Sequence, residues 1–281
     1  MPARLLVTRL KTYRRKTYRP GQVRSVRGAI AFVNQRGFVF FWPIQGVELP
    51  SLWVAAAGDR SVGAEHDDPG HVTWRWKDSL LGEHQWYYAK LLRKRATLVS
   101  LEVAPYFYAL TENYGAPEED YLIQYEEGRM TQEAKRIYEA VLNEGPMDTV
   151  ALRRKVGLSS TESKARFDRA LLELQADMKL LPVGVAEAGA WNYAFIYDIV
   201  ARHLPELPER ARQITEPEAR SKLLELYLRS VGAAPAAMPG KLFGWRKGDL
   251  QRSIEDGVSA GALRRDLTGT SGEWIALAEL Q

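Results

Sequence analysis

The feature that most constrains the fold is an order of elements that occurs twice between residues 128 and 281. In each copy a long amphipathic helix is followed by a short helix, a third helix and two strands. This order predicts a winged-helix unit, which is a helix-turn-helix carrying a two-stranded wing. Because a repeated plan is a stronger signal than a single motif, the sequence predicts an α+β fold of tandem winged-helix units.

The first copy, residues 128–205, is the more regular one. Its first helix has one apolar face at helical spacing and ends at a Gly-Pro pair. Ser159 and Glu162 have the spacing of a capping box, so we expect them to open the third helix. Residues 180–185 and 191–197 flank a glycine-containing turn and predict the wing.

The second copy, residues 213–281, repeats the same plan. Thr215 and Glu218 form another capping-box pattern before a long amphipathic helix. Residues 263–267 and 274–277 would be its wing.

The N-terminal part, residues 1–116, is less regular and includes a small β-rich part. Residues 86–92 and 96–101 predict two strands joined by the charged turn Arg93–Lys94–Arg95. The acidic stretch 118–127 after a Gly-Ala-Pro turn predicts a boundary before the first repeat. The predicted domains are therefore 1–116, 128–205 and 213–281.

Positive charge is concentrated at the N-terminus, although the net charge is only +4. No acidic residue precedes Glu48. A block of one sign gains affinity for a polyanion through counterion release, so this arm is a candidate for phosphate contacts, the alternative being a solubilising tail. The candidates in the arm are Arg14, Arg15, Lys16, Arg24, Arg27 and Arg36.

Two further basic groups fit the same partner. Lys164, Arg166 and Arg169 lie on the third helix of the first repeat, away from its apolar stripe, where they could bind phosphates or guanine edges. A solvated helix face is the alternative. The tip Arg93–Lys94–Arg95 suits a groove or a gap at a lesion, although a solvated turn can have the same composition.

Aromatic residues are dense in the N-terminal part, where they either form core or stack on bases. The segment that best fits a functional role is Trp74–Arg75–Trp76–Lys77–Asp78, because it mixes aromatic and charged side chains. Phe40 and Trp42 have the same two interpretations.

Several segments resemble the AlkZ/YcaQ-like winged-helix DNA glycosylases. They are Tyr138–Pro146, Arg166–Leu174, Pro182–Val185, Tyr227–Gly232 and Leu242–Trp245. The resemblance implies three winged-helix units with a small β-rich part around a DNA-binding channel. It also implies excision of bulky alkylated bases, including crosslinks, by hydrolysis of the N-glycosidic bond without a metal.

The sequence departs from that family at its Gln-aliphatic-Gln or Gln-aliphatic-Asp signature, which positions the attacking water. Phe40 and Trp42 occupy the two polar positions. Gln45, Glu48 and Asp78 are the candidate replacements. The leading hypothesis is therefore a DNA-binding protein linked to repair, without the family's catalytic signature. The alternatives are a glycosylase with a relocated polar residue, a winged-helix transcriptional regulator and a protein-interaction scaffold.

Composition excludes other classes of function. The chain has no cysteine, and its four histidines show no ligand spacing, so we expect neither a metal nor a cofactor. No apolar run approaches the roughly 20 residues of a membrane span. We therefore expect a cytoplasmic protein, monomeric, with double-stranded DNA, intact or damaged, as its partner.

Overall fold

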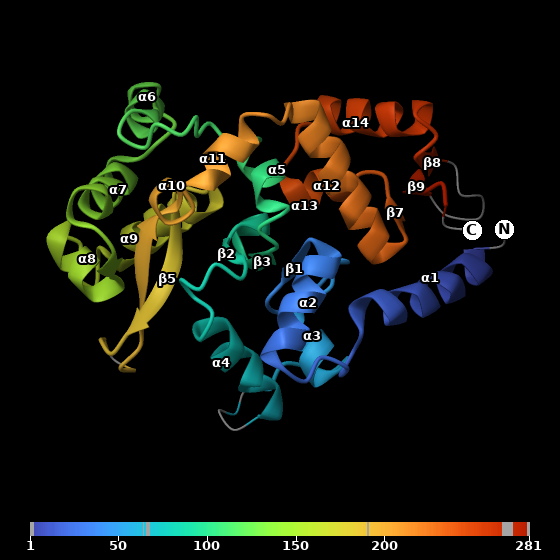
Figure 1. The fold of residues 1–281 in the computed structure, drawn as a ribbon, viewed down its shortest axis with the longest axis horizontal. Coiled ribbons are helices and arrows are strands. Elements are labelled where there is room, and N and C mark those ends of the chain that lie inside the picture. The colour runs from blue at the N-terminus through green and yellow to red at the C-terminus, as the bar shows by residue number, and fades with distance from the viewer. Residues whose placement is uncertain (1–2, 64, 66–67, 190, 266–271, 280–281) are drawn as a thin grey trace. The chain divides into compact units, whose positions relative to one another are not determined.

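A computed structural model describes residues 3–63, 65, 68–189, 191–265 and 272–279 (Figure 1). Contacts divide the chain into two units. The first consists of Met1–Trp76 together with Glu216–Gln281, and the second is Lys77–Thr215. The architecture is mixed α+β, with helices predominating over short strands.

The first unit combines the N-terminal helices with the C-terminal segment. Its helices are α1 (Ala3–Tyr18), α2 (Val26–Arg36), α3 (Leu52–Ala57), the 3-10 turn η1 (Pro69–His71), α4 (Val72–Asp78), which runs on into the second unit, α12 (Glu216–Val231), α13 (Met238–Phe243) and α14 (Lys247–Ser259). Its strands are β1 (Phe38–Phe40), β7 (Ala233–Pro235), β8 (Leu263–Arg265) and β9 (Trp274–Leu277).

The predicted range 1–116 is not one compact unit, because its N-terminal helix packs against α12. Tyr13 donates a hydrogen bond to the carbonyl of Arg229 (2.8 Å), and Thr17 donates to the carbonyl of Ser230 (2.7 Å). The carbonyl groups in the last turn of a helix have no hydrogen-bond partners within the helix, and these bonds satisfy two of them in α12. The predicted basic arm is therefore a helix fastened to the C-terminal segment.

The second unit contains the first repeat and the segment before it. Its helices are the 3-10 turn η2 (Leu92–Lys94), α5 (Ala104–Tyr108), α6 (Asp120–Glu126), α7 (Gln132–Glu144), α8 (Thr149–Lys155), α9 (Lys164–Ala176), α10 (Val200–His203) and α11 (Glu206–Ala211). Its strands are β2 (Tyr87–Lys90), β3 (Ala96–Val99), β4 (Met147–Asp148), β5 (Leu180–Ala186) and β6 (Ala194–Ile199).

The described residues pass three times through the order helix, strand, helix, helix, strand, strand. The passes are α2 to β3, α7 to β6 and α12 to β9. In the last two, the strand after the first helix pairs with the final strand, which gives the sheet orders β4-β6-β5 and β7-β9-β8. β4 and β7 are not predicted from the sequence, because strands of two or three residues carry almost no periodicity. The predicted strand 263–267 ends at Arg265, and its last two residues lie outside the described ranges.

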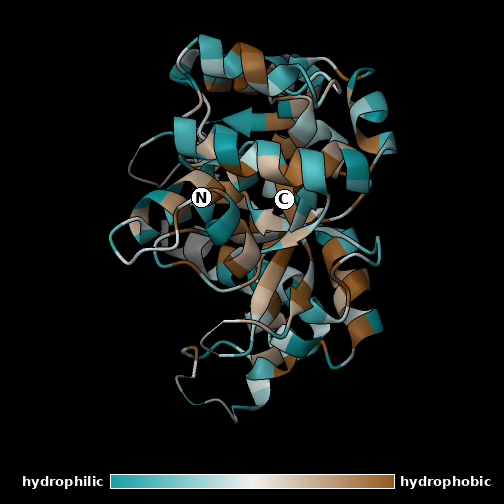
Figure 2. Ribbon diagram, turned by 90° about the vertical axis from the view of Figure 1, so that its left-hand side faces the viewer, coloured by the Kyte–Doolittle hydropathy of each residue, from teal (hydrophilic) through white to brown (hydrophobic). Residues whose placement is uncertain are grey.

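The apolar face predicted for the first helix of the middle repeat is buried. Ile137 and Val141 of α7 and Phe167 of α9 have no exposed area, and they pack in one cluster with Leu152 of α8. Figure 2 shows apolar and hydrophilic residues alternating along the helices. The long helices thus owe their stability to one buried stripe each.

The predicted capping box of the third helix is wrong, because the helix is capped at Ser163, four residues after Ser159. α9 begins at Lys164, and the backbone N–H of Ser163 donates to the hydroxyl of Ser160 at 3.2 Å. Ser159 does not cap the helix, because a turn over residues 161–163 intervenes. α12 begins at Glu216, directly after Thr215, where the second capping box places its start.

The acidic stretch predicted as a boundary contains helix α6. The Asp120 carboxylate accepts hydrogen bonds from the backbone N–H groups of Tyr114 (2.8 Å), Gly115 (3.1 Å) and Ala116 (3.1 Å). Tyr121 is buried against the core of the second unit. Acidic residues in this stretch predict a loop, but the carboxylate of Asp120 instead stabilises the turn before helix α6.

Gly82 should tolerate no side chain. Its φ is +80°, and a Cβ there would lie 2.6 Å from the carbonyl oxygen of Val183. We expect Gly82→Ala to lower the free energy of unfolding by roughly 3 kcal/mol, from left-handed strain plus the contact with backbone. Urea unfolding of Gly128→Ala provides the control, because Gly128 has a φ of +71° and nothing within 4 Å. Equal losses in the two variants would show that the Val183 contact costs nothing.

No helix within the described residues is long and apolar enough to cross a membrane.

Candidate nucleic-acid interface

Helix α9 buries one side and leaves basic side chains on the other. Phe167 and Leu174 lie in the core, whereas Lys164, Arg166 and Arg169 are exposed. Arg166 is paired with Glu133 at 3.2 Å. Lys164 and Arg169 have no ion pair among the described residues, so their charges are available to an anion.

The turn between β2 and β3 presents three successive exposed cations. Arg93 and Lys94 adopt left-handed backbone conformations, with φ of 50° and 56°. Thr97 fixes the turn, because its hydroxyl accepts from the N–H of Leu92 (3.2 Å) and donates to the carbonyl of Arg95 (2.7 Å). The three basic side chains of this turn are exposed, and their contact with DNA stays a prediction.

The basic residues of the N-terminal segment divide into two groups. Arg15, Lys16, Arg24 and Arg27 are exposed. Arg14 is half-buried, pairs with Glu48 at 2.9 Å and donates to the carbonyl of Val231 at 3.1 Å. Arg36 is half-buried and donates to the carbonyl of Arg229 at 3.4 Å, and burial lowers its pKa. Arg14 and Arg36 are thus engaged within the fold, and their contacts with DNA stay a prediction.

Two of the four aromatic candidates are core. Phe40 has no exposed area and Trp76 is 6% exposed, so neither ring can stack on a base, and this part of the prediction is corrected. Trp42 is half-buried, with its ring centroid 4.9 Å from that of Trp53. Trp74 is 44% exposed and stacks on His71 at 5.6 Å, so it remains a candidate for base contact.

Lys77 and Asp78 form an ion pair with each other. The Lys77 ammonium is buried, 2.6 Å from Asp78 Oδ1 and 4.4 Å from the Phe195 ring centroid. Tyr193 accepts from Lys77 (3.0 Å) and donates to Asp78 (2.9 Å). Burial lowers the pKa of Lys77, although Asp78 opposes the shift. The structure therefore does not support a phosphate contact for Lys77 or a catalytic role for Asp78. In a buried ion pair, the attraction between the two charges offsets the cost of removing them from water.

The other two catalytic candidates lie in one short segment. Gln45 is exposed, in a turn. Glu48 is also exposed, and besides Arg14 it accepts a long hydrogen bond from Tyr18 (3.5 Å). The structure therefore brings together Arg14 and Glu48, which sequence analysis had assigned to different roles.

A buried cation in the second unit is not among the residues predicted from the sequence. Lys179 is 3% exposed and donates to Asn113 Oδ1 at 2.5 Å. Burial lowers its pKa to about 8, while Asp177 and Asp120 oppose the shift. The available signal was a single lysine between Met178 and Leu180 in an otherwise apolar run.

We expect the free energy of unfolding to rise with pH because of Lys179. Between pH 8 and 10.5 the unfolded chain holds a proton that folded Lys179 has released, so the slope is positive. The full contribution is roughly 3 kcal/mol. Urea unfolding of wild type and Lys179→Met at pH 7.5, 9 and 10 would measure it, since their difference cancels other titrating groups. A difference that does not change with pH would mean that Lys179 titrates normally.

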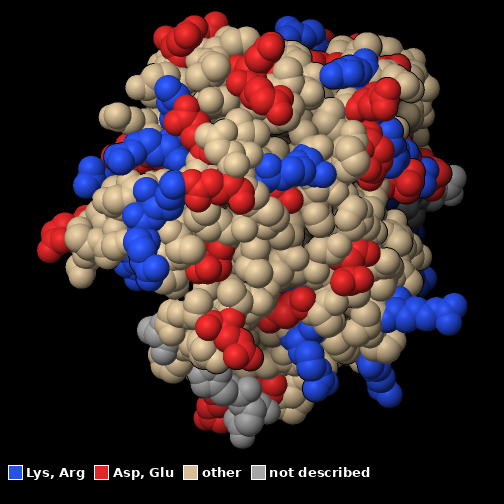
Figure 3. All heavy atoms as spheres, turned by 60° about the vertical axis from the view of Figure 1, so that its left-hand side comes forward, with Lys and Arg blue, Asp and Glu red and all other residues tan. Residues whose placement is uncertain are grey.

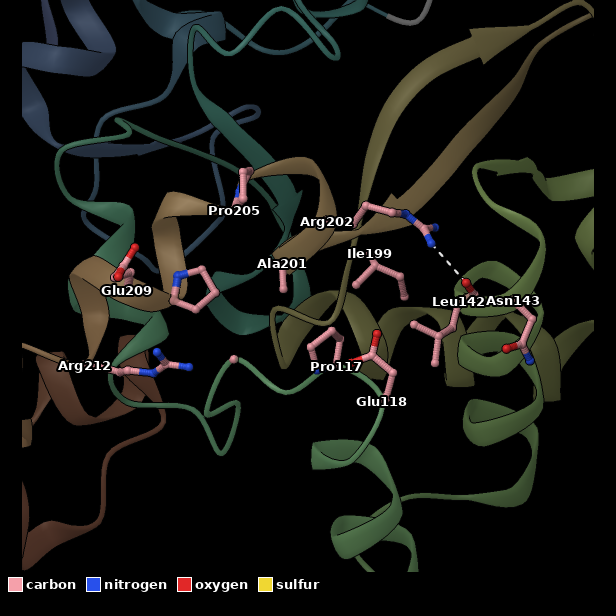
Figure 4. A pocket seen from close by; sticks show the side chains of 12 residues that line it. Pro117, Glu118, Leu142, Asn143, Ile199, Ala201, Arg202, Pro205, Glu209 and Arg212 are labelled. Atoms are coloured by element: carbon pink, nitrogen blue, oxygen red, sulfur yellow. Dashed lines mark hydrogen bonds between the residues drawn. The ribbon is translucent and has the colours of Figure 1, made fainter.

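A cleft of the second unit contains two arginines that are already engaged (Figure 4). Arg202 donates to the carbonyls of Leu142 (3.0 Å) and Val141 (2.7 Å) at the end of α7. Arg212 donates to the carbonyl of Tyr114 at 3.0 Å. Glu118 and Glu209 line the same cleft, so it offers little attraction to phosphate. The face drawn in Figure 3 likewise mixes acidic and basic side chains.

The fold brings two histidines together without completing a metal site. The rings of His84 and His203 lie 4.5 Å apart between centroids. Among the described residues, no three histidine, aspartate or glutamate side chains are grouped as a metal site requires.

Comparisons with known proteins identify one family. The model of the AlkZ-related family matches residues 23–244. Among solved structures, the Streptomyces sahachiroi DNA glycosylase AlkZ has a similar fold, with a TM-score of 0.55 and 14% identity over 96% of this chain and 69% of that chain. No curated protein matches the sequence.

Proposed function

The chain belongs to the AlkZ-related family, and from this premise we propose that it binds double-stranded DNA in the recognition or repair of alkylated or crosslinked sites. Such a protein would act in the cytoplasm, as a monomer, without a metal or cofactor. The fold shared with a DNA glycosylase supports a repair-related role.

We further propose that the three passes of helix, strand, helix, helix, strand, strand are three winged-helix units. The sheet orders β4-β6-β5 and β7-β9-β8 support this, because in a winged helix the strand after the first helix joins the wing. The third helix of such a unit enters the major groove. In the middle unit that helix is α9.

The observation that carries the proposal is the exposed basic side of α9. Lys164 and Arg169 are exposed on the helix that would enter the groove, outside its buried stripe. The second unit also exposes Arg93, Lys94 and Arg95 at the turn between β2 and β3. These five cations can neutralise phosphates, which supplies most non-specific affinity for DNA.

We propose that the protein does not use the catalytic chemistry of its relatives. The aligned positions of the Gln-containing signature are Phe40, which is buried, and Trp42, which is half-buried among aromatic rings. Neither side chain can position a water or stabilise positive charge on a sugar. Of the candidate replacements, Glu48 supports the alternative of an active glycosylase, because it is exposed and beside a cation.

One set of assays tests the proposal. Fluorescence anisotropy with duplex DNA should show binding whose log affinity falls against log salt with a slope of about −4 to −5, from about −0.9 for each of five phosphates. Duplexes carrying alkylated purines should bind and yield no abasic product after incubation and alkali. Abasic product would establish the glycosylase alternative, and salt-independent or absent binding would favour a protein-interaction scaffold. Binding only as a dimer to a palindrome would favour a transcriptional regulator.

A further inference from the structure

The first unit contains a cavity of about 750 Å³ between α1, the segment 43–49 and α3. Its volume lies in the range of ligand pockets, roughly 300–1,000 Å³. The wall is largely apolar and includes Ile44, Val47, Leu49, Val54 and Trp274. A planar ring system can therefore be enclosed there, with the indole of Trp274 as an aromatic surface.

One polar group stands out in this cavity. Glu48 Oε2 forms an ion pair with Arg14 Nη1 at 2.9 Å and accepts a hydrogen bond from the Tyr18 hydroxyl at 3.5 Å. Oε1 receives no hydrogen bond among the described residues, and 49% of the side chain is exposed. Arg14 is itself held in place by the carbonyls of Val231 (3.1 Å) and Ala233 (3.3 Å). The cavity thus presents a fixed cation beside a carboxylate with spare acceptor capacity.

The α1 side of the rim is basic, whereas the exposed Asp59 lines the cavity elsewhere. Lys11 and Arg15, which are four residues apart on α1, both line it and are exposed. Side chains at this spacing project from the same side of a helix. A phosphate attached to a ligand in the cavity would meet these two cations.

We propose that this cavity binds a guanine base together with its phosphate, with Glu48 reading the base. Guanine is the nucleobase that presents two adjacent donors, N1–H and the N2 amino group, on its Watson–Crick edge, with the acceptor O6 alongside. A carboxylate accepts both donors, and Arg14 can donate to O6. Adenine and cytosine place a ring acceptor against the carboxylate instead. The base can come from a free nucleotide or from an unpaired position in DNA, and the latter source rests on the proposed function.

Isothermal titration with nucleoside monophosphates tests the site directly. We expect GMP to bind at least about tenfold more tightly than AMP, from the energy of a bidentate contact. IMP, which lacks the N2 amino group, should lie between them. Glu48→Gln should remove the preference for GMP, because its amide puts a donor where the base needs an acceptor. Glu255→Gln, an exposed carboxylate on α14, is the matched control and should bind like wild type.

A second arm separates the two sources of guanine and the two proposals. Duplexes with a single unpaired guanine should bind more tightly than those with an unpaired adenine, and Glu48→Gln should equalise them while leaving fully paired DNA unchanged. Preference for GMP without preference in DNA would assign the cavity to free nucleotides. Equal binding of GMP and AMP, or wild-type preference in Glu48→Gln, would overturn the inference even if paired DNA binds. Loss of paired-DNA binding alone would instead overturn the proposed function.

Discussion

Replacing Phe40 with glutamine is expected to destabilise the protein by about 3 kcal/mol and to create no ability to release alkylated bases. The substitution restores the residue type of the relatives' signature at the first aligned position. Phe40 has no exposed area, and its backbone N–H is bonded to the carbonyl of Pro50 at 2.9 Å. The amide would therefore be buried without partners, and a large apolar ring would be lost.

Thermal and urea unfolding, combined with an abasic-site assay, would test this expectation. Phe40→Leu is the matched control, because it removes aromatic volume without burying a polar group and should cost about 1 kcal/mol. Phe40→Gln combined with Trp42→Gln restores both positions and should remain inactive. Abasic product from the double variant would show that the site lacks only its polar pair, and that the residues around it still support base release.

The sequence predicted the repeat units because their helices are long and their stability depends on one apolar stripe. Ile137, Val141 and Phe167 recur at helical spacing and are all buried. Short elements were not predictable in the same way. β4 contains two residues, and α6 is rich in acids, so neither has a pattern that stands out from a loop. Their formation depends on partners distant in the sequence, such as Tyr197 opposite Met147.

The candidate site was less predictable, because composition identifies charge but not its partner. Lys164 and Lys77 have the same side chain, yet one is exposed and the other is enclosed by Asp78 and aromatic rings. Arg14 looks like part of a basic arm until folding places Glu48 beside it. Pairing across more than thirty residues is set by the tertiary structure and leaves no local signal.

Replacing Lys164 and Arg169 together with alanine is expected to weaken DNA binding by about tenfold to a hundredfold. Both cations are exposed on α9, the helix that would enter the major groove. If each neutralises one phosphate, the slope of log affinity against log salt should become less steep by about 1.8. Because both side chains are on the surface, the variant should unfold at the wild-type urea concentration. Anisotropy titrations at several salt concentrations measure affinity and slope together.

The matched control removes two cations from the same unit that are already neutralised. Arg129 pairs with Glu112 and Glu127, and Lys135 pairs with Glu139 at 3.6 Å. Arg129→Ala combined with Lys135→Ala makes the same change in net charge, but it removes no cation that is free to displace counterions. The slope should therefore stay at the wild-type value. Equal weakening by both pairs would mean that net charge alone drives binding, and that α9 has no special position on the DNA.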